Sequence, residues 1–409
     1  MNIEKLKKYA NILLTTGVNL QQDQILVVSV DVENKDFAII VAKEAYALGA
    51  TDVVINWQCA PIGRARLLHA HTDALANPAK WIPTYYEQYV EEKATFLSLI
   101  SANPNALSGI PGERISLQSR NLNKVLSFYH SAIMNSAVTW CVAAVPTVLW
   151  ANLLGYTGSD DDKIDRLWDT ILTLCRLENI PMKESFKHHM SRLKKRTDAL
   201  NILNLKSLHY TCTNGTDIIV QLPVGHVWQG GAEAAKDGRI FNANIPTEEV
   251  FSAPQYNGVN GIVYSTKPLI YHGNTISDFS IEFKKGRIVN YNAAEGLEII
   301  KELIETDEGS HFLGEIALVD HYSPISESNT IYFETLFDEN ASCHFAIGAA
   351  YPTCLENSDG LDDNALKERG LNHSLTHVDF MIGHENMNII GTTQSGQEVA
   401  IMIDGRLQV

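Results

Sequence analysis

The sequence predicts an α/β protein with two domains, an N-terminal parallel α/β sheet domain and a β-rich α+β C-terminal domain. In the first half, nearly continuous apolar runs alternate with helical stretches, which is typical of a parallel sheet covered on both faces. In the second half, short strand-like runs dominate, and one clear helix interrupts them. The length of 409 residues also exceeds the size at which a single hydrophobic core stops growing.

The first domain is expected to span residues 1–190. Its predicted helices cover 3–18, 35–49 and 114–133, and its predicted strands are ILVVSVDV, TDVVINW, TFLSLISA and AVTWCVAAVP. A charged helical region follows from Ser159 to about Leu200, and the boundary is placed inside it.

The second domain is expected to span residues 191–409. Short strands are predicted in SLHYTCT, DIIVQLP and GIVYSTKPLIY, a hairpin with a glycine turn in FSIEFKKGRIVNY, and a helix in EGLEIIKELIETDE.

The charge balance and the cysteines limit the classes of partner and compartment. With 32 basic and 48 acidic residues, the net charge is −16, and such a surface repels nucleic acid and anionic membranes. No run of about 18 apolar residues predicts a membrane span. The N-terminus has no signal-peptide cleavage pattern, and the six scattered cysteines form no C-x-x-C pair. We therefore expect a cytoplasmic protein that binds neither nucleic acid nor membrane.

Common catalytic motifs are absent from the sequence. HENMN is not the H-E-x-x-H zinc motif because its last position is Asn388, and there is no G-x-S-x-G, P-loop or G-x-G-x-x-G. His188 and His189 lie in a basic, polar helix, where a solvated helix face is expected.

The segment THVDFMIG is the first candidate for chemistry. In a strand, His377 and Asp379 point to one face, and Val378, Phe380 and Ile382 point to the other. A histidine and an aspartate on one face can ligate a divalent ion. The alternative is the solvent-facing edge of an amphipathic strand.

Two further segments carry carboxylates in unusual settings. FLGEIALVDH places Glu315 inside an apolar run, where burial of an unpaired carboxylate is costly and a metal ion would remove the penalty. NIPTEEVFSAP holds Glu248 and Glu249 between two prolines in an extended setting. The alternative for Glu315 is a strand whose Glu315 side faces water. The alternative for Glu248 and Glu249 is a surface turn.

The segment FDENASCHFAIGAAY contains Glu339, His344 and Tyr351. A buried neutral histidine can also bond a backbone carbonyl, and a tyrosine can belong to the core, so this segment alone proves little. Oxygen and nitrogen ligands from four separated segments together suit a pair of Zn²⁺, Co²⁺, Mn²⁺ or Mg²⁺ ions, with no thiolate required.

Together, IPTEEVFSAP, FLGEIALV, LFDENASCHFAIGAAYPT and LTHVDFMIG resemble the thermophilic metallo-aminopeptidase family of the aminopeptidase T and aminopeptidase S type. GTDIIVQLP, VWQGG and SPIS are supporting matches, and the ordered set covers about residues 210–385. The resemblance implies a homodimeric enzyme that holds two divalent ions per chain in its C-terminal domain and removes N-terminal residues from small peptides.

The resemblance also implies a role for each candidate residue. The implied metal ligands are Glu249, Glu315, Glu339, His344, His377 and Asp379. Glu315 would bridge both ions, Tyr351 would be the catalytic tyrosine, and Glu249 or a neighbouring carboxylate would accept a proton. Glu334 and His373 look atypical for the family, and both lie near the site in sequence.

The implied mechanism uses two ions about 3.5–4 Å apart to acidify a bridging water, while the Tyr351 hydroxyl hydrogen-bonds the oxyanion. The N-terminal domain would supply the dimer contact and close the cleft so that only small peptides enter. Two alternatives stay open. One is a two-metal hydrolase of another bond, such as a phosphoester, and the other is a non-catalytic, metal-stabilised assembly protein.

Overall fold

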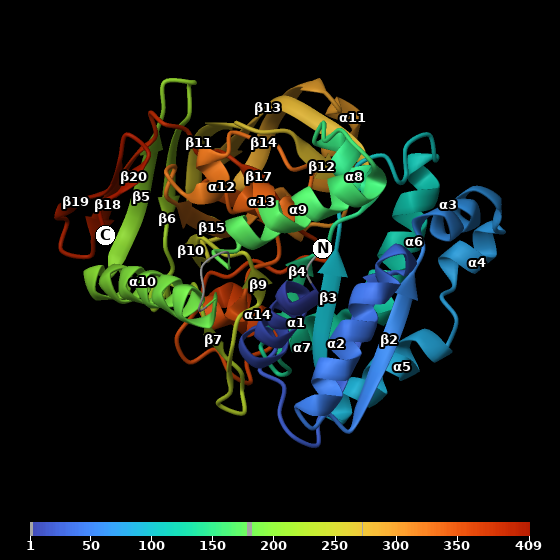
Figure 1. The fold of residues 1–409 in the computed structure, drawn as a ribbon. Coiled ribbons are helices and arrows are strands. Elements are labelled where there is room, and N and C mark those ends of the chain that lie inside the picture. Colours follow the sequence, from blue (N-terminus) through green and yellow to red (C-terminus); the bar gives the residue numbers. More distant parts are fainter. Residues whose placement is uncertain (1–2, 178–181, 272) are drawn as a thin grey trace. The chain divides into compact units, whose positions relative to one another are not determined.

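The computed structural model describes residues 3–177, 182–271 and 273–409 (Figure 1). The chain forms two compact units, one made of Met1–Met190 with Ala232–Thr247 and the other of Ser191–Gly231 with Glu248–Val409. Nothing in the sequence pattern predicted that Ala232–Thr247 joins the first unit. None of the described helices is long and apolar enough to cross a membrane.

The first unit is built on a parallel sheet with the strand order β2-β1-β3-β4-β9. Every pairing in this sheet is parallel, and its strands are β1 (Ile25–Asp31), β2 (Asp52–Gln58), β3 (Thr95–Ile100), β4 (Trp140–Ala144) and β9 (Asn244–Ile245). β1 and β3 are inner strands of this sheet, and most of their residues are apolar and buried. The parallel sheet predicted from the apolar runs is therefore confirmed.

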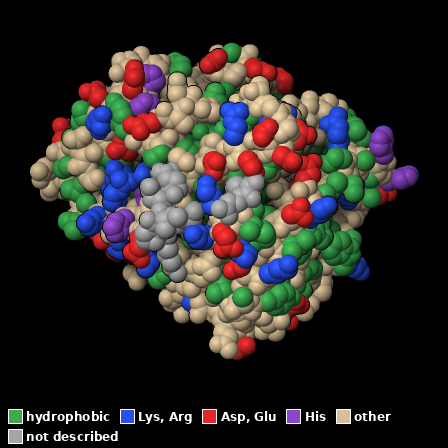
Figure 2. Space-filling model, viewed as in Figure 1, with side chains coloured by type: hydrophobic (Ala, Val, Ile, Leu, Met, Phe, Trp, Pro, Cys, Tyr) green, Lys and Arg blue, Asp and Glu red, His purple; other side chains and the backbone are tan. Residues whose placement is uncertain are grey.

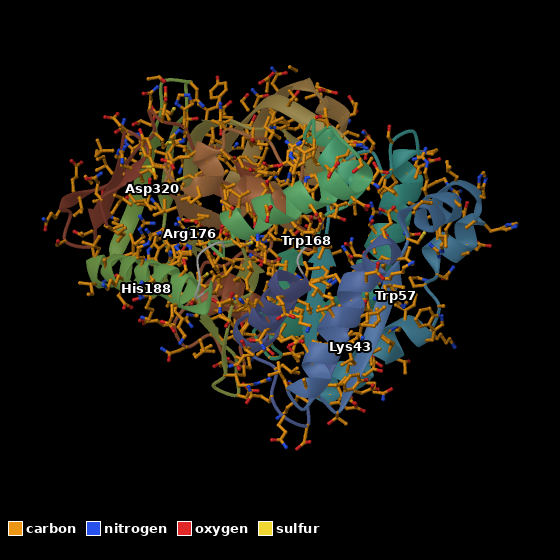
Figure 3. All side chains as sticks on the ribbon, in the orientation of Figure 1. Lys43, Trp57, Trp168, Arg176, His188 and Asp320 are labelled. Atoms are coloured by element: carbon orange, nitrogen blue, oxygen red, sulfur yellow. The ribbon has the colours of Figure 1, made fainter. Side chains whose placement is uncertain are left out.

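Helices of the first unit precede and connect these strands (Figure 1). They are α1 (Ile3–Ile12), α2 (Lys35–Ala47), α3 (Ala60–His69), α4 (Thr72–Ala76), α5 (Trp81–Glu91), α6 (Gly112–Val125), α7 (Ser127–Met134), α8 (Val148–Leu153) and α9 (Asp160–Leu174). A π-helical turn (Leu13–Gly17) continues α1 to within one residue of the end of the predicted helix at 3–18. Trp168 of α9, labelled in Figure 3, packs against Tyr9 and Phe37 from α1 and α2.

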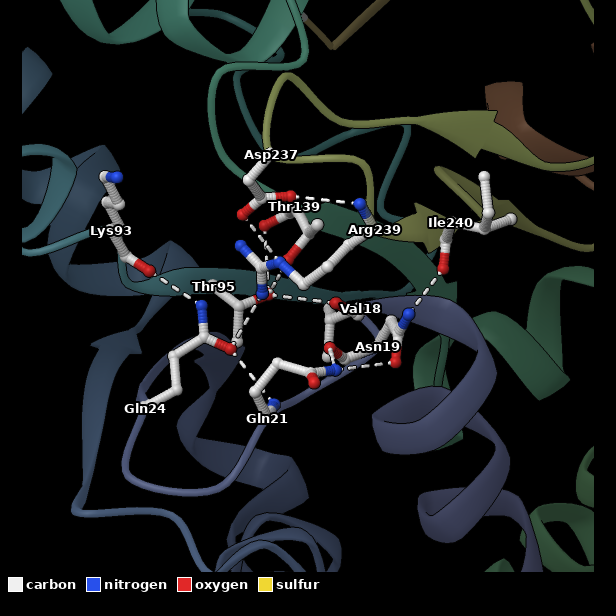
Figure 4. A network of polar contacts seen from close by, with 10 residues as sticks. All are labelled: Val18, Asn19, Gln21, Gln24, Lys93, Thr95, Thr139, Asp237, Arg239 and Ile240. Atoms are coloured by element: carbon white, nitrogen blue, oxygen red, sulfur yellow. Dashed lines mark hydrogen bonds and ion pairs between the residues drawn. The ribbon is translucent and has the colours of Figure 1, made fainter.

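The segment Ala232–Thr247 joins the first unit through β9 and through polar contacts (Figure 4). It also contains the short strands β7 (Glu233–Ala234) and β8 (Ile240–Phe241). Arg239 donates to Gln24 at 2.9 Å, and Asn19 donates to the carbonyl of Ile240 at 2.7 Å. In the same view, the hydroxyls of Thr95 and Thr139 lie 2.8 Å apart.

The second unit contains an antiparallel sheet of nine strands among the described residues. They are β5 (Leu205–Thr211), β6 (Asp217–Gln221), β11 (Val259–Tyr264), β12 (Leu269–Tyr271), β13 (Asn274–Lys284), β14 (Arg287–Glu295), β18 (Asn388–Thr393), β19 (Glu398–Ile403) and β20 (Arg406–Leu407). The predicted hairpin is β13–β14, and Gly286 lies in its turn with φ 81°. A Cβ there would lie 1.8 Å from the carbonyl oxygen of Tyr256, so only glycine fits.

A second antiparallel sheet of this unit has four strands in the order β10-β15-β16-β17. They are β10 (Glu249–Ser252), β15 (Leu313–Val319), β16 (His344–Gly348) and β17 (His377–Met381). The remaining helices are α10 (Met182–Leu203), which begins within the first unit's residues, α11 (Leu297–Ile304), α12 (Pro324–Glu327), α13 (Thr335–Glu339) and α14 (Asp363–Glu368). A β-rich α+β second half was predicted, and the structure confirms that fold class.

Candidate metal centre

One face of the four-stranded sheet carries the polar side chains that were predicted to bind metal. The antiparallel register places Glu315, Ala346 and Asp379 in one row across β15, β16 and β17. Because side chains alternate along a strand, His344 and His377 share this face as the first residues of β16 and β17. The small side chain of Ala346 between Glu315 and Asp379 leaves room for groups to converge.

Glu249 reaches the same face from the edge strand β10. It pairs with Val319 of β15. Val319 lies four residues after Glu315, so both side chains point to the same face of the sheet. Both glutamates are buried, with 6% and 5% of their surfaces exposed. The apolar run around Glu315 therefore forms a buried strand, and its carboxylate does not face water.

His344 is held in one orientation by two backbone carbonyls. Its Nδ1 lies 3.0 Å from the carbonyl oxygen of Glu339 and 3.0 Å from that of Ser342. Because carbonyls only accept hydrogen bonds, Nδ1 carries the proton. The other nitrogen, Nε2, then faces Glu249 Oε2 at 2.9 Å and Glu315 Oε1 at 3.7 Å.

His377 repeats this arrangement on the other side of Glu315. Its Nδ1 donates to the carbonyl oxygen of Ala349 at 2.7 Å. Its Nε2 lies 3.4 Å from Glu315 Oε2 and 3.6 Å from Asp379 Oδ1. A histidine that donates Nδ1–H to a carbonyl and turns Nε2 toward carboxylates has the arrangement of a metal ligand.

Two groups of ligand atoms therefore share Glu315. One atom each from Glu249, Glu315 and His344 lie within 4.8 Å of one another, and so do atoms from Glu315, His377 and Asp379. Exposed acidic groups often cluster without an ion, but the first of these groups is fully buried. A carboxylate common to both groups is suited to bridge two cations.

Glu339 approaches the two groups from the end of α13. It is 9% exposed, and burial together with the carboxylates of Asp379 and Glu249 raises its pKa well above the ordinary value. Burial also raises the pKa of Glu249. Although burial opposes it, hydrogen bonds to Glu249 and Glu315 raise the pKa of His344 well above its ordinary value. Burial is the largest cause of the two glutamate shifts, and neighbouring carboxylates raise the pKa of all three groups.

The donor set fits a pair of divalent cations. The four carboxylates Glu249, Glu315, Glu339 and Asp379 carry a charge of −4 when ionised, and two divalent cations carry +4. Burying such charges without compensation costs several kcal/mol per ion. The oxygen and imidazole donors match the preferences of Zn²⁺, Co²⁺ and Mn²⁺.

Tyr351 lies beside this centre. Its ring meets the ring of His377 edge-on at a centroid distance of 5.2 Å and also packs against Phe251 at 5.6 Å. The side chain is only partly buried. The residue predicted as catalytic is therefore close to one candidate ligand.

Glu334 and His373, the two atypical positions, lie in different surroundings. Glu334 precedes α13 and accepts a hydrogen bond from the backbone N–H of Leu336 at 3.0 Å. Burial and the nearby Asp338 raise the pKa of Glu334 to about 8. His373 is exposed and lies 3.3 Å from Asp363.

Sequence reasoning missed the groups that orient the candidate ligands. The carbonyls that hold the two imidazoles belong to the backbone and leave no side-chain signal. The prediction of a solvated helix face was right for His188, which is exposed (Figure 3), and wrong for His189, which is 5% exposed. His189 Nε2 lies 2.7 Å from the carbonyl oxygen of Thr247.

Three known aminopeptidases align with nearly the whole chain. Aminopeptidase AmpS of Bacillus subtilis (strain 168) is 40% identical over 402 residues, which is 98% of each chain. Aminopeptidase 2 of Geobacillus stearothermophilus is 40% identical and aligns over 98% of this chain and 97% of its own. Aminopeptidase T of Thermus thermophilus is 33% identical over 98% of each chain.

A solved structure and a family model extend the likeness to the whole chain. Wild-type AmpT from Thermus thermophilus superposes with a TM-score of 0.90 at 32% identity, and each chain is covered completely. The family model described as thermophilic metalloprotease (M29) matches residues 2–407. The resemblance drawn from the sequence motifs is confirmed, and the chain belongs to the M29 family of thermophilic metalloproteases.

Proposed function

We propose that this chain is a metal-dependent aminopeptidase that hydrolyses N-terminal residues from small peptides through a water activated by two divalent ions. The observation that carries the proposal is the pair of ligand groups that share the buried Glu315. The aminopeptidase names of the relatives support a peptide substrate with a free N-terminus.

The residues that would hold the ions fall into two sets around Glu315. Glu249 and His344 lie on one side, and His377 and Asp379 lie on the other. Glu339 completes the set from α13. When bound, two divalent ions lower the pKa of a shared water and polarise the scissile carbonyl.

The chain's own groups prepare this chemistry in two ways. The carbonyls of Glu339, Ser342 and Ala349 fix the orientation of both imidazoles, so their Nε2 atoms need no reorganisation. Glu249, whose pKa burial raises, is the carboxylate that we assign to take up the proton of the attacking water, since a raised pKa makes a carboxylate a better base near neutrality.

Tyr351 is assigned to the oxyanion. The assignment is supported by the contact of its ring with His377, which places the side chain beside the centre. A phenol hydroxyl that donates to the developing negative charge stabilises the transition state more than the bound peptide.

The decisive assay compares substrate classes on the same purified protein. Activity on aminoacyl substrates and on phosphoesters is measured before and after removal of metal, and again after addition of Co²⁺ or Zn²⁺. Metal-dependent release of N-terminal residues is expected. Phosphoester hydrolysis alone would favour a different hydrolase, and no activity on either class would favour an assembly protein.

We also propose a cytoplasmic homodimer. None of the six cysteines forms a disulfide, which suits a reducing compartment.

The first unit exposes Ile39, Trp57 and Ile62 on or near the edge strand β2, and apolar side chains gather on this part of the surface (Figure 2). We assign this unit to dimer contact and to restricting the site to small peptides. Trp57→Glu should lower the mass seen in sedimentation without changing metal content.

A further inference from the structure

One peptide bond close to Glu249 has both of its polar groups held by buried side chains. The carbonyl oxygen of Thr247 lies 2.7 Å from His189 Nε2, and the N–H of Glu248 donates to Asn340 Oδ1 at 2.6 Å. His189 is 5% exposed and Asn340 is fully buried. Because a carbonyl cannot donate, His189 must carry its proton on Nε2.

This peptide bond leads directly into the candidate metal centre. Glu249 is the next residue after Glu248 and the first of β10, and its carboxylate lies 2.9 Å from His344 Nε2. The chain also passes from the first unit to the second between Thr247 and Glu248. Fixing the plane of this peptide therefore limits the directions in which the side chain of Glu249 can point.

Asn340 connects this peptide with a second candidate ligand. It directly follows Glu339, and its Nδ2 donates to the carbonyl of Leu336 in α13 at 2.8 Å. One buried amide thus holds the start of β10 against the end of the helix that carries Glu339.

We propose that His189 and Asn340 are positioning residues that act on Glu249 through the Thr247–Glu248 peptide and set the affinity of the centre for its cations. The inference rests on the proposed metal centre, and it assigns a function to a histidine in a helix otherwise rich in basic residues. Groups that orient metal ligands without touching the metal typically contribute about 10–100-fold in affinity or activity.

The test measures Zn²⁺ affinity of the metal-free, full-length protein by competition with a chelator. His189→Met removes the donor, whereas His189→Gln keeps a side-chain N–H. The matched control is His226→Met, because His226 is also buried and its Nδ1 bonds a backbone carbonyl, that of Pro223 at 3.1 Å. We expect His189→Met to weaken Zn²⁺ binding about 10-fold, His189→Gln to regain most of it, and the control to bind like wild type.

A second pair of variants tests whether both residues act through the same peptide. Asn340→Leu should also weaken Zn²⁺ binding, and the double variant with His189→Met should lose less than the two single effects combined, since both remove restraints from one group. If Asn340→Leu does not fold, Asn340→Ala takes its place. Additive losses would overturn the shared route.

The outcomes separate this inference from the proposed function. If the wild-type protein binds no Zn²⁺, the metal centre itself fails. If the wild-type protein binds Zn²⁺ but His189→Met binds it as tightly as His226→Met does, only the positioning role is overturned. A loss of thermal stability in His189→Met without a change in Zn²⁺ affinity would likewise show a merely structural histidine.

Discussion

The two units differ in the charge of the titratable side chains that they bury. In the first unit, burial raises the pKa of Tyr9, Tyr129 and Cys141, so these groups stay neutral at physiological pH and need no counter-ion. In the second unit, one face of the four-stranded sheet buries Glu249 and Glu315 and partly buries Asp379, beside two histidines. Buried charge without compensation is costly, and this difference is why we propose the second unit as the place of the chemistry.

The largest expected effect comes from Glu315→Gln. The substitution keeps the shape of the side chain but removes its charge where both ligand groups meet. We expect aminopeptidase activity to fall below detection and metal occupancy to drop, with circular dichroism unchanged. Glu327→Gln, at an exposed residue of helix α12, is the control and should behave like wild type. Near-normal activity of Glu315→Gln would show that the ligands are wrongly assigned.

The next effect is expected for Tyr351→Phe, which removes only a hydroxyl. Loss of one oxyanion donor typically lowers kcat by about 10²–10³. Because the contact forms mainly in the transition state, KM should change little. Metal content should stay at the wild-type value, and Tyr322→Phe, at an exposed tyrosine, should keep full kcat. Loss of metal in proportion to activity would instead make Tyr351 structural.

A pair of alanines in the two units sharpens the comparison. Ala143 in β4 and Ala346 in β16 are both fully buried in strands. Leucine at either position overpacks the core and should lower the free energy of unfolding by about 1–3 kcal/mol. Only Ala346→Leu should also weaken Zn²⁺ binding, because Ala346 lies between Glu315 and Asp379. Equal Zn²⁺ affinity in both variants would contradict the proposal that only the sheet containing Ala346 binds the metal.

The smallest effect is expected in the polar network of the first unit. Thr95→Val removes a hydroxyl that bonds the hydroxyl and the carbonyl of Thr139 (Figure 4). Unfolding in urea should show a loss of about 1–2 kcal/mol, while kcat/KM and metal content stay unchanged. A loss of activity larger than the loss of folded protein would mean that the first unit takes part in the chemistry.

The sequence predicted elements whose signals are local. The apolar runs of β1 and β3 and the glycine turn at Gly286 are visible in the order of residues alone. Breaks within predicted helices were missed, as between α6 and α7, because the sequence there remains helical in character. The return of Ala232–Thr247 depends on long-range pairing of β9 with β4, which no local pattern encodes.

The candidate site was only partly predictable for the same reason. Periodicity placed His377 and Asp379 on one strand face, but their approach to Glu315 depends on the register of three strands. The buried His189 was mistaken for a solvated residue because its neighbours in α10 are basic and polar. Its partner is a backbone carbonyl 58 residues away, which carries no side-chain signal.

The number of cations per chain tests the two-ion centre most directly. Metal-free protein is titrated with Zn²⁺, and bound metal is determined by elemental analysis after removal of free ions. Saturation near two equivalents per chain is predicted, because Glu315 belongs to two ligand groups. Saturation at one equivalent would contradict the two-ion centre, and saturation at two that persists in Glu315→Gln would contradict its bridging role.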